Sequence, residues 1–248
     1  MATNNISTNY KFIRVPRTSS RLREIVAKFR TERLSALETD PASFVSQHAT
    51  ESALPLEVWN NRLSRETTVL ICVASNNDST PLDDETALIH GEWAGFAALR
   101  GPLSYEDYYF SADMNLPVPA NPQAEARWYI YDLYTLPAHR GRGLAKRLVN
   151  TSIQLAVAGT QTLRTLSSDN VSLQSARIRL FMNPKNTWLV QMYEGFGFRG
   201  VGRVTKTEGL RAGALDDSLP EDTESSEELR RFWHSRNGLA MEQVVMVG

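Results

Sequence analysis

The sequence predicts an α+β fold with a mixed, mostly antiparallel central sheet of about six or seven strands flanked by helices. Strand-like segments come first, and a β–α–β–α–β succession with a final antiparallel pair follows them. Within that succession, an aromatic strand runs through a glycine-containing turn into an amphipathic helix. Because the chain shows no repeat and no domain-splitting linker, we expect one domain over residues 1–248.

Hydrophobic periodicity places the individual elements along the chain. Three long insertions interrupt the pattern, at about 101–126, 160–175 and 207–237. We expect the acidic run 216–228 to be a solvated loop rather than a docking surface, because like charges repel one another. The aromatic insertion 101–126 either packs over a sheet edge or forms a wall of a pocket. The expected strands are 11–15, 67–74, 92–99, 128–136, 178–182, 200–204 and 241–246, and the expected helices are 21–37, 56–65, one beginning near 141–142, and 187–194.

Composition narrows the class of protein. With 42% apolar residues among 248, the chain can bury a full hydrophobic core. Its net charge of −1 provides no basic field for nucleic acid or an anionic membrane. The single cysteine, Cys72, excludes an intramolecular disulfide and a cysteine-rich metal site, and the histidines lack metal spacing. With no signal-like or membrane-spanning segment, we expect a soluble cytoplasmic protein without a metal, a nucleic-acid partner or a membrane.

The segment 128–156 carries the strongest functional signal. Residues 129–136 are aromatic and β-branched and are bounded by Pro137, which is typical of a buried strand. The string 140–143, Arg-Gly-Arg-Gly, follows and leads into the helix. Amides at a helix start are unpaired, and glycines let an anion approach the backbone. The turn is therefore a predicted pyrophosphate site, and the alternative is a plain helix cap with incidental glycines.

The type of phosphate site follows from the spacing. The chain has no nucleotide P-loop string, and Lys146 stands where a dinucleotide fingerprint has its third glycine. The residues instead resemble the acyl-CoA-binding signature of the GNAT superfamily of N-acetyltransferases. That signature is Arg or Gln, two residues, Gly, one residue, then Gly or Ala, and Arg140, Gly143 and Ala145 fill it. The preceding segment 132–137 is similar to the usual end of the fourth strand in this family.

A second, independent motif supports the same resemblance. Strand 176–182 is followed by Asn183-Pro184-Lys185-Asn186 and a helix over 187–194. The second motif of the family is an Asn, a small or apolar residue, then Tyr-Glu-x-x-Gly-Phe. Two motifs in the right order are a specific signal, and the resemblance covers roughly residues 67–204. The second motif is filled by Asn186, Leu189, Tyr193, Glu194, Gly197 and Phe198.

The resemblance implies acyl transfer from the thioester of acetyl-CoA to an amine, on a sheet that is open between its fourth and fifth strands. The pantetheine arm would pair with the fourth strand as a peptide augments an open sheet edge. The amides of the turn would hold the pyrophosphate. His139, next to Arg140, could contact a phosphate, but we favour an exposed turn residue. The implied cofactor-binding residues are Leu133, Tyr134, Thr135, Arg140, Gly141, Arg142, Gly143, Leu144, Ala145, Lys146, Asn186 and Tyr193.

Two of these residues have alternative roles. Asn186 would hydrogen-bond the cofactor arm, or it would cap the following helix, and both are compatible. Tyr193 matches the tyrosine that protonates the departing thiolate in many relatives. A phenol can do this only when it is oriented and partly desolvated. The alternative for Tyr193 is a core aromatic residue on an apolar helix.

The residues at the positions where relatives carry the general base depart from the family pattern. Relatives often place Glu or His at positions matching Tyr129 or Tyr131, which share one face of the strand. Asp132 is the only carboxylate on this strand and should point to the opposite face unless a bulge re-aims it. We favour a structural role for Asp132 over catalysis. The base is then water relayed through Tyr129 or Tyr131, or a carboxylate of the insertion, Glu106 or Asp107.

The candidate catalytic residues are therefore Tyr193, Tyr131 and Asp132. The leading hypothesis is an N-acetyltransferase that acetylates a primary amine of a small molecule or peptide by direct transfer in a ternary complex, as a monomer or homodimer. The alternative is a non-catalytic acyl-CoA-binding module that kept the phosphate site and lost its base. Acidic residues in the aromatic insertion favour a cationic amine as acceptor.

Overall fold

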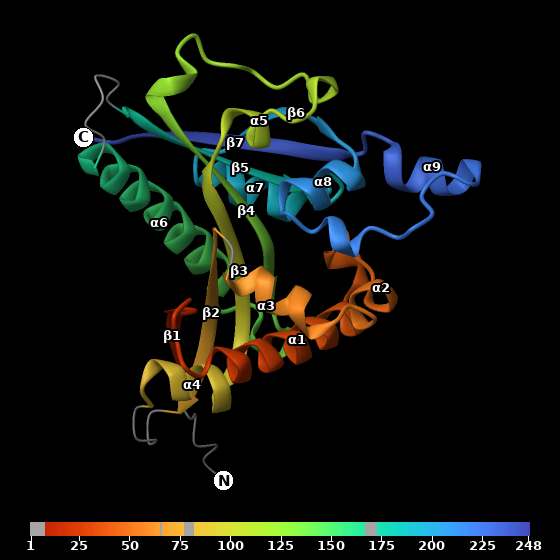
Figure 1. Ribbon diagram of the computed structural model, residues 1–248. Coiled ribbons are helices and arrows are strands. Elements are labelled where there is room, and N and C mark those ends of the chain that lie inside the picture. Colours follow the sequence, from red (N-terminus) through yellow and green to blue (C-terminus); the bar gives the residue numbers. More distant parts are fainter. Residues whose placement is uncertain (1–7, 65, 77–81, 167–172) are drawn as a thin grey trace.

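Seven strands pair into one sheet in the order β1-β2-β3-β4-β5-β7-β6 (Figure 1). The structure is a computed structural model that describes residues 8–64, 66–76, 82–166 and 173–248. All neighbouring strands are antiparallel except β4 and β5, which confirms the predicted mixed, mostly antiparallel sheet. The strands are β1 (Thr8–Arg14), β2 (Thr67–Asn76), β3 (Glu92–Leu103), β4 (Glu125–Thr135), β5 (Ser175–Met182), β6 (Arg199–Val204) and β7 (Gly238–Met246).

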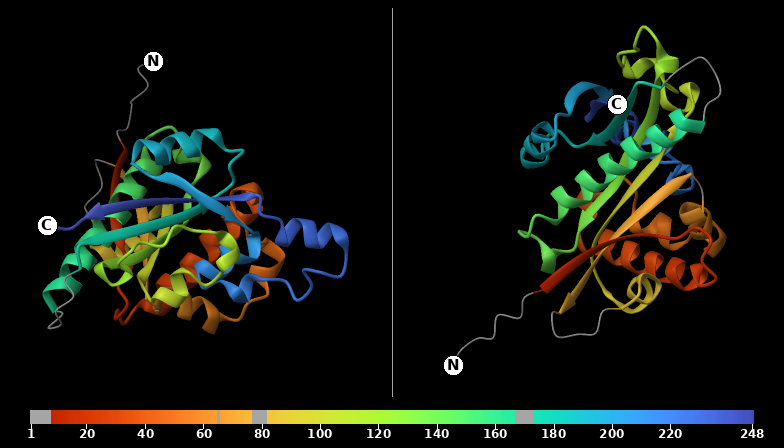
Figure 2. Two further views of the ribbon diagram at one scale, coloured as in Figure 1. Left: turned by 90° about the horizontal axis from the view of Figure 1, so that it is seen from above. Right: turned by 90° about the vertical axis from the view of Figure 1, so that its left-hand side faces the viewer.

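Helices cover both faces of this sheet. Figure 2 shows α6 running along one face while α1 lies on the other. The helices are α1 (Leu22–Thr39), α2 (His48–Ser52), α3 (Leu56–Ser64), α4 (Asp84–His90), α5 (Tyr105–Tyr108), α6 (Leu144–Leu166), α7 (Thr187–Gly195), α8 (Lys206–Ala212) and α9 (Glu227–His234). Short 3-10 turns are η1 (Pro41–Ser43), η2 (Ala112–Met114), η3 (Pro122–Ala124), η4 (Pro137–His139) and η5 (Asp216–Ser218).

The core on the α1 face is aromatic. Phe29 of α1 lies edge-on to Trp59 of α3 and to Phe96 of β3, with ring centroids 6.0 and 6.1 Å apart. These rings are almost fully buried, together with Trp93. Large buried rings supply most of the apolar burial that holds α1 and α3 against the sheet.

On the α6 face, the helix packs closely against the sheet at Gly159. An atom added at Cβ of Gly159 would lie 2.6 Å from the ring of Trp128, so the glycine lets α6 settle onto β4. The indole Nε1 of Trp128 donates to Thr160 Oγ1 at 3.0 Å. Because α6 carries the predicted phosphate turn at its start, this contact fixes that turn relative to β4.

The C-terminal half of the sheet is cross-linked by a buried ionic cluster. Arg177 of β5 contacts Glu125 of β4 and Glu242 of β7, each at 2.9 Å. Arg179 pairs with Glu242 at 2.7 Å and lies over the ring of Tyr108 of α5, 3.5 Å from its centroid. Tyr108 therefore anchors the aromatic insertion to this half of the sheet.

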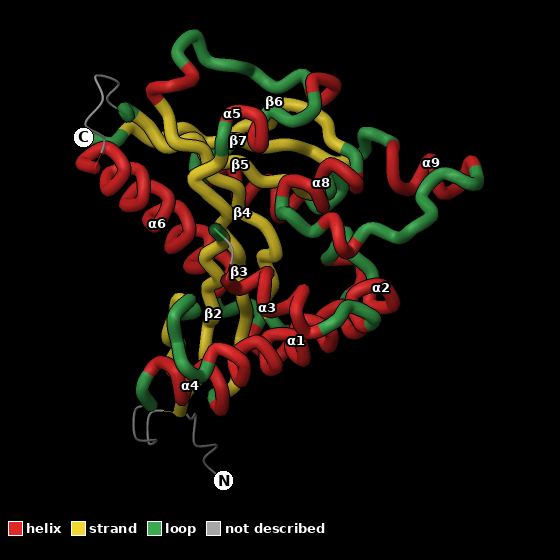
Figure 3. Tube along the Cα trace, in the orientation of Figure 1, coloured by secondary structure: helices red, strands yellow, loops and turns green. Residues whose placement is uncertain are grey.

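The long segments expected as insertions contain more regular structure than the sequence indicated. The stretch after residue 160 begins as helix, because α6 continues to Leu166. The 207–237 segment forms α8, η5 and α9, as the tube in Figure 3 shows. The acidic run is thus not a plain solvated loop: it includes η5, and α9 begins within it. Helices α2 and α4 were not predicted, because each is too short for a clear hydrophobic period.

We predict that Gly159→Ala lowers the free energy of unfolding by about 1–2 kcal/mol, because overpacking against Trp128 outweighs the gain in helix propensity. The matched control is Gly209→Ala in α8, where the nearest atom, of Val45, would lie 4.0 Å away. This control should be neutral or stabilising by up to about 1 kcal/mol. Urea unfolding measures both, and a stabilising Gly159→Ala would contradict the close approach.

Candidate active site

The two parallel strands at the centre of the sheet pair over only part of their length. Their register runs from Glu125 opposite Ser175 to Ile130 opposite Leu180 and stops there. β4 nevertheless continues to Thr135 and stays paired with β3 on its other side. Among the described residues, no strand pairs with the β5-facing side of 131–135. This segment therefore offers free backbone groups to an extended ligand.

A β-bulge lies in this unpaired segment. Between the pairs Ala98–Tyr131 and Phe96–Tyr134, β3 advances two residues (96 to 98) and β4 advances three (131 to 134). The bulge contains Asp132, whose backbone has a left-handed conformation with φ of 53°. Non-glycine residues in this region are uncommon and store about 1 kcal/mol or more of strain. The bulge places Asp132 on the α1 side, where its carboxylate reaches Arg33.

The bulge settles the orientation of the neighbouring residues. Tyr129 and Tyr131 stack on one face, with centroids 5.6 Å apart and planes 12° apart, as the strand period predicted. Asp132 lies on the same face as these two tyrosines, which is also the face that α1 covers. In a regular strand it would point to the opposite face, but the bulge turns it round. Leu133 packs on the α6 side, and Tyr134 is buried on the α1 side.

The glycine turn has the conformation that an anion site needs. Gly141 and Gly143 have φ of 75° and 73°, which only glycine adopts readily. An atom at either Cβ would meet nothing within 4 Å, so space is open beside both residues. α6 begins at Leu144, and its first intrahelical bond is donated by Arg147 to the carbonyl of Gly143. The amides of residues 144–146 therefore precede the helical bonding pattern and carry the positive end of the helix dipole.

Two arginines flank this turn. Arg140 donates from Nε to the carbonyl of Thr135 at 3.0 Å and pairs through Nη2 with Asp40 at 2.6 Å. Arg142 donates to the hydroxyl of Tyr10 at 2.7 Å. Both residues are exposed to solvent, and each guanidinium contacts a protein group in this structure.

The prediction for His139 was wrong. His139 is buried, 6% exposed, and its ring nitrogens lie 3.2 Å from the Tyr10 hydroxyl and 3.1 Å from Glu92. The turn η4 folds the imidazole inward against β1 and β3, and neither partner is near it in sequence. His139 therefore holds Tyr10, the hydrogen-bond partner of Arg142, in place.

Helix α7 supplies the other side of the opening. Asn186 is its N-cap, and Oδ1 accepts from the amide of Leu189 at 3.2 Å. The capping role that the sequence allowed is present, and the side chain is also exposed. Tyr193 lies in the last turn of α7. It is buried against Phe198, and burial raises the pKa of its phenol. The described residues provide no hydrogen-bond partner for its hydroxyl.

The phenols near the end of the parallel ladder lie in two packing clusters. Tyr193 packs in a cluster with Ile130 and residues of α6, whereas Tyr129 and Tyr131 pack in another with Tyr108. Burial raises the pKa of Tyr129, and the nearby groups that add to this effect include Asp132, Tyr131 and Tyr193. Burial likewise raises the pKa of Tyr131 to about 12, and its hydroxyl lies 3.4 Å from Thr67 Oγ1.

A buried ion network surrounds Asp132. Its carboxylate lies 2.8 Å from Arg33 Nη1 and is 16% exposed. Burial raises the pKa of Asp132, the positive charge of Arg33 opposes that rise, and Glu51 adds to it. Burial would also raise the pKa of Glu51, but the guanidiniums of Arg33 and Arg62 outweigh burial and lower it to about 2. Asp132 is thus the more basic carboxylate of the two.

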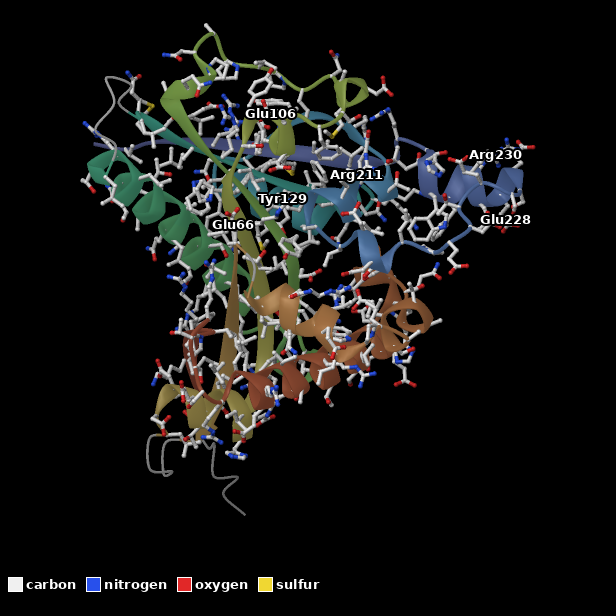
Figure 4. The ribbon with its side chains drawn as sticks, viewed as in Figure 1. Glu66, Glu106, Tyr129, Arg211, Glu228 and Arg230 are labelled. Carbon is white, nitrogen blue, oxygen red and sulfur yellow. The ribbon has the colours of Figure 1, made fainter. Side chains whose placement is uncertain are left out.

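The face of β4 that carries the tyrosines is covered by the insertions. Figure 4 shows Tyr129 in the middle of the molecule, with Glu106 on α5 and Arg211 on α8. A cavity of about 10 Å³, the size of one water, borders Tyr129, Asp107 and Arg179. Glu106 is exposed on α5, whereas Asp107 contributes to the cavity wall. Of the two carboxylates proposed from the insertion, Asp107 is therefore the one beside a site residue.

The site thus combines an open glycine turn at a helix start with an unpaired strand edge, and tyrosines and Asp132 lie where the parallel ladder ends. The model of the acetyltransferase (GNAT) family matches residues 37–198, more than half of the chain. The chain belongs to this family. The match includes both motifs, from Arg140 to Phe198, and β4 with its bulge.

Solved structures of low identity resemble the chain over most of its length. A protein from Acinetobacter baylyi, provisionally named an acetyltransferase, is 12% identical, with 96% of this chain and 94% of that chain covered and a TM-score of 0.52. NAA60 of Arabidopsis thaliana, in complex with acetyl-CoA, is 15% identical, with 96% and 99% covered and a TM-score of 0.49. Spermidine N-acetyltransferase of Vibrio cholerae, with CoA and spermine, is 12% identical, with 96% and 95% covered and a TM-score of 0.41. None of the curated proteins compared with this chain matches it significantly.

The GNAT-like architecture and the open sheet predicted from the sequence are confirmed. In the described part of the chain, no helix is long and apolar enough to cross a membrane, and no group of three or more His, Cys, Asp or Glu could hold a metal ion.

The residues of the turn and strand also fit coenzyme A. The glycines leave room for a pyrophosphate, and the free edge of β4 suits an extended arm. One buried polar atom beside that edge, Thr135 Oγ1, has no hydrogen-bond partner among the described residues. A ligand atom would relieve the cost of such an unpaired group.

The sequence analysis missed Arg33, Glu51 and Arg62, which surround Asp132. A signal for Arg33 was present: it interrupts the apolar stripe of α1 between Phe29 and Leu37, where a charged residue has no place without a buried partner. Glu51 and Arg62 gave no comparable signal, because α2 and α3 are short and polar.

We predict that Gly143→Val weakens the binding of coenzyme A at least tenfold. The residue would have to hold φ near 73°, and its branched side chain would fill the open space beside the turn. Isothermal titration with free coenzyme A measures the change. Gly195→Ala, whose Cβ would also meet nothing within 4 Å, is the control and should bind as the wild type does. Unchanged affinity of Gly143→Val would exclude the turn as the anion site.

We also predict that Glu51 makes the fold acid-sensitive. Its pKa of about 2 lies below that of an unfolded glutamate, so its stabilisation is present above about pH 4.5 and is lost as the pH falls towards 2. The loss is on the order of 3 kcal/mol. Urea unfolding between pH 5 and pH 2 should therefore show a steeper decline for the wild type than for Glu51→Gln. Parallel declines would contradict the low pKa.

Proposed function

We propose that this protein is an acetyl-CoA-dependent N-acetyltransferase that acetylates a primary amine of a small molecule or peptide by direct transfer in a ternary complex. The observation that carries the proposal is the juxtaposition of the open glycine turn with the unpaired edge of β4. Membership of the acetyltransferase (GNAT) family supports the reaction class.

Cofactor binding would use the turn, the strand edge and α7. The amides from Gly141 to Lys146 would hold the pyrophosphate, with Arg140 and Arg142 adding positive charge. Leu133, Tyr134 and Thr135 border the free edge that would accept the pantetheine arm. Asn186, exposed at the start of α7, would donate its amide to the same arm while its oxygen keeps the cap.

Tyr193 is proposed as the general acid. When bound, acetyl-CoA supplies an activated carbonyl whose carbon–sulfur bond breaks. Tyr193 would donate its phenolic proton to the departing sulfur, and its raised pKa keeps that proton in place until the thiolate forms. The hydroxyl has no competing protein partner among the described residues, which leaves it free for this contact.

Asp132 is proposed as the base, with Tyr131 beside it. The carboxylate would take the proton that the amine nitrogen loses as its bond to the acetyl carbon forms. Burial raises the pKa of Asp132, which makes the carboxylate a better proton acceptor near neutral pH. Tyr131, stacked on Tyr129 and hydrogen-bonded to Thr67, would orient the amine or a bridging water. The bulge thus provides the carboxylate that the sequence pattern lacked at Tyr129 and Tyr131.

A non-catalytic acyl-CoA-binding module remains the second candidate, and the covered face of β4 favours it, because only a cavity of about 10 Å³ borders Tyr129. Steady-state release of CoA thiol separates the two. The panel comprises spermidine, an aminoglycoside, free amino acids and short peptides with a free N-terminus. Turnover of at least one amine supports the enzyme, whereas coenzyme A binding without turnover of any supports the module.

We predict that Tyr193→Phe lowers kcat at least tenfold and leaves the affinity for coenzyme A little changed, because only the donated proton is lost. Pre-steady-state measurement of acyl transfer isolates the chemical step. Phe198→Leu, which loses the ring contact with Tyr193 but no hydroxyl, is the packing control. An unchanged rate of acyl transfer in Tyr193→Phe would remove the acid role.

A further inference from the structure

Five elements from three separate stretches of the chain contribute to one ion network. Arg33 of α1 and Arg62 of α3 both contact Glu51 of α2, at 3.0 and 3.1 Å. Arg62 also reaches Asp217 of η5 at 2.7 Å, and Arg33 reaches Asp132 of β4 at 2.8 Å. Glu51 is fully buried and Arg33 is 1% exposed. The network therefore extends from the solvent edge at η5 to the carboxylate beside the opening of the sheet.

Every face of the Arg33 guanidinium is in contact. Nε and Nη2 donate to the two oxygens of Glu51 at 3.2 and 3.0 Å. Nη2 also donates to Ser46 Oγ at 2.9 Å, and the group lies over the ring of Phe44, 4.5 Å from its centroid. A bidentate carboxylate and a stacked ring fix the plane of the guanidinium. The remaining nitrogen, Nη1, lies 2.8 Å from Asp132 Oδ1, so the two groups form an ion pair, although no N–H of Nη1 makes a well-aligned hydrogen bond among the described residues.

Stability alone does not account for this arrangement. Buried ion pairs are often no more stabilising than apolar residues of the same volume, because desolvation offsets the attraction. Asp132 has φ of 53°, a left-handed conformation that aspartate adopts more readily than most other non-glycine residues. The bulge and this conformation place the carboxylate on the face where Arg33 lies, 2.8 Å away, which indicates a defined orientation.

We propose that Arg33, held by Glu51, is a positioning residue that fixes the Asp132 carboxylate on the tyrosine face of β4, where it accepts the proton of the substrate amine. This inference rests on the proposed function, in which Asp132 is the base. Arg33 itself touches neither the amine nor coenzyme A in this scheme; it acts through Asp132.

The charges around Asp132 have opposite effects on its protonation. Arg33 and Arg62 lower the pKa of Asp132, whereas burial and Glu51 raise it, and the neighbouring phenols on β4 are Tyr129 and Tyr131. Asp217 partly neutralises Arg62. A base acts only when it is deprotonated, so a higher pKa moves the acidic limb of the kcat/KM profile to higher pH, and a lower pKa moves it to lower pH.

Two substitutions in the same network should therefore shift the limb in opposite directions. Arg33→Met removes a positive charge 2.8 Å from Asp132 and should raise its pKa by about 1 unit or more. Glu51→Gln removes a negative charge and leaves both arginines, so the limb should move to lower pH. A purely structural role would lower the folded fraction in both variants and leave the limb in place.

The full-length protein is assayed with the amine from the panel that the wild type acetylates fastest. In parallel, the carboxyl carbon of Asp132 is titrated by NMR after γ-¹³C-aspartate labelling, with Asp132→Asn for assignment. Arg33→Lys keeps the charge and should restore the limb to near its wild-type position. Arg177→Met, which breaks another buried ion pair remote from Asp132, is the matched control and should leave the limb in place.

If Glu51→Gln does not fold, Asp217→Asn serves instead. Asp217 is 23% exposed and pairs with Arg62, so its neutralisation should move the Asp132 pKa and the limb to lower pH by a smaller amount. Opposite shifts of the limb that match the NMR pKa values support the positioning role. The positioning role would be overturned if the Asp132 pKa measured by NMR changed without a matching change in the acidic limb of kcat/KM. It would also be overturned if Arg33→Met and Glu51→Gln moved that limb in the same direction. Either result would leave the acetyltransferase assignment intact. Absence of wild-type turnover with every amine would overturn the proposed function and this role with it.

Discussion

The pairing of β4 with β5 is the constraint on which the rest of the site depends. A parallel ladder that continued to Thr135 would satisfy the backbone groups of both strands and leave no edge for an extended ligand. The ladder stops at Ile130, and the bulge at Asp132 follows at once. Ladder end, bulge and glycine turn lie in order along one stretch of chain. A single strand therefore sets the positions of the free edge, the carboxylate and the anion turn.

Much of the architecture could be predicted from local sequence. The turn at Gly141 and Gly143 was recognisable because its conformation restricts the residue type, and both glycines do have positive φ. The alternation of Tyr129 and Tyr131 was equally local, and their rings do stack. Short or polar elements such as α2, α4 and α9 were missed, since each lacks the several turns that a hydrophobic period requires.

The surroundings of Asp132 could not be predicted for a different reason. A bulge changes which face a side chain occupies, and no residue type in the 131–135 segment announces one. The partner of Asp132, Arg33, lies about 100 positions earlier in the chain. Asp217, which joins the same network through Arg62 and Glu51, lies about 85 positions later. Such contacts arise from the packing of whole elements. The role of His139 was misjudged for the same reason, because its partners come from β1 and β3.

The contacts between Arg62 and η5 connect two parts of the molecule that lie on either side of the β4–β5 ladder. Strands β1 to β4 with helices α1 to α3 form one wing of the sheet, and β5 to β7 form the other; within the sheet, the two wings meet at the short parallel ladder of β4 and β5 (Figure 1). The chain between β6 and β7 leaves the second wing, reaches across through Asp217 and Ser218 to Arg62, and returns. It acts as a brace between the wings. Ser218 also donates to Glu51, and Arg100 donates to the carbonyl of Ala212, so the two wings cannot move apart here without breaking several polar contacts.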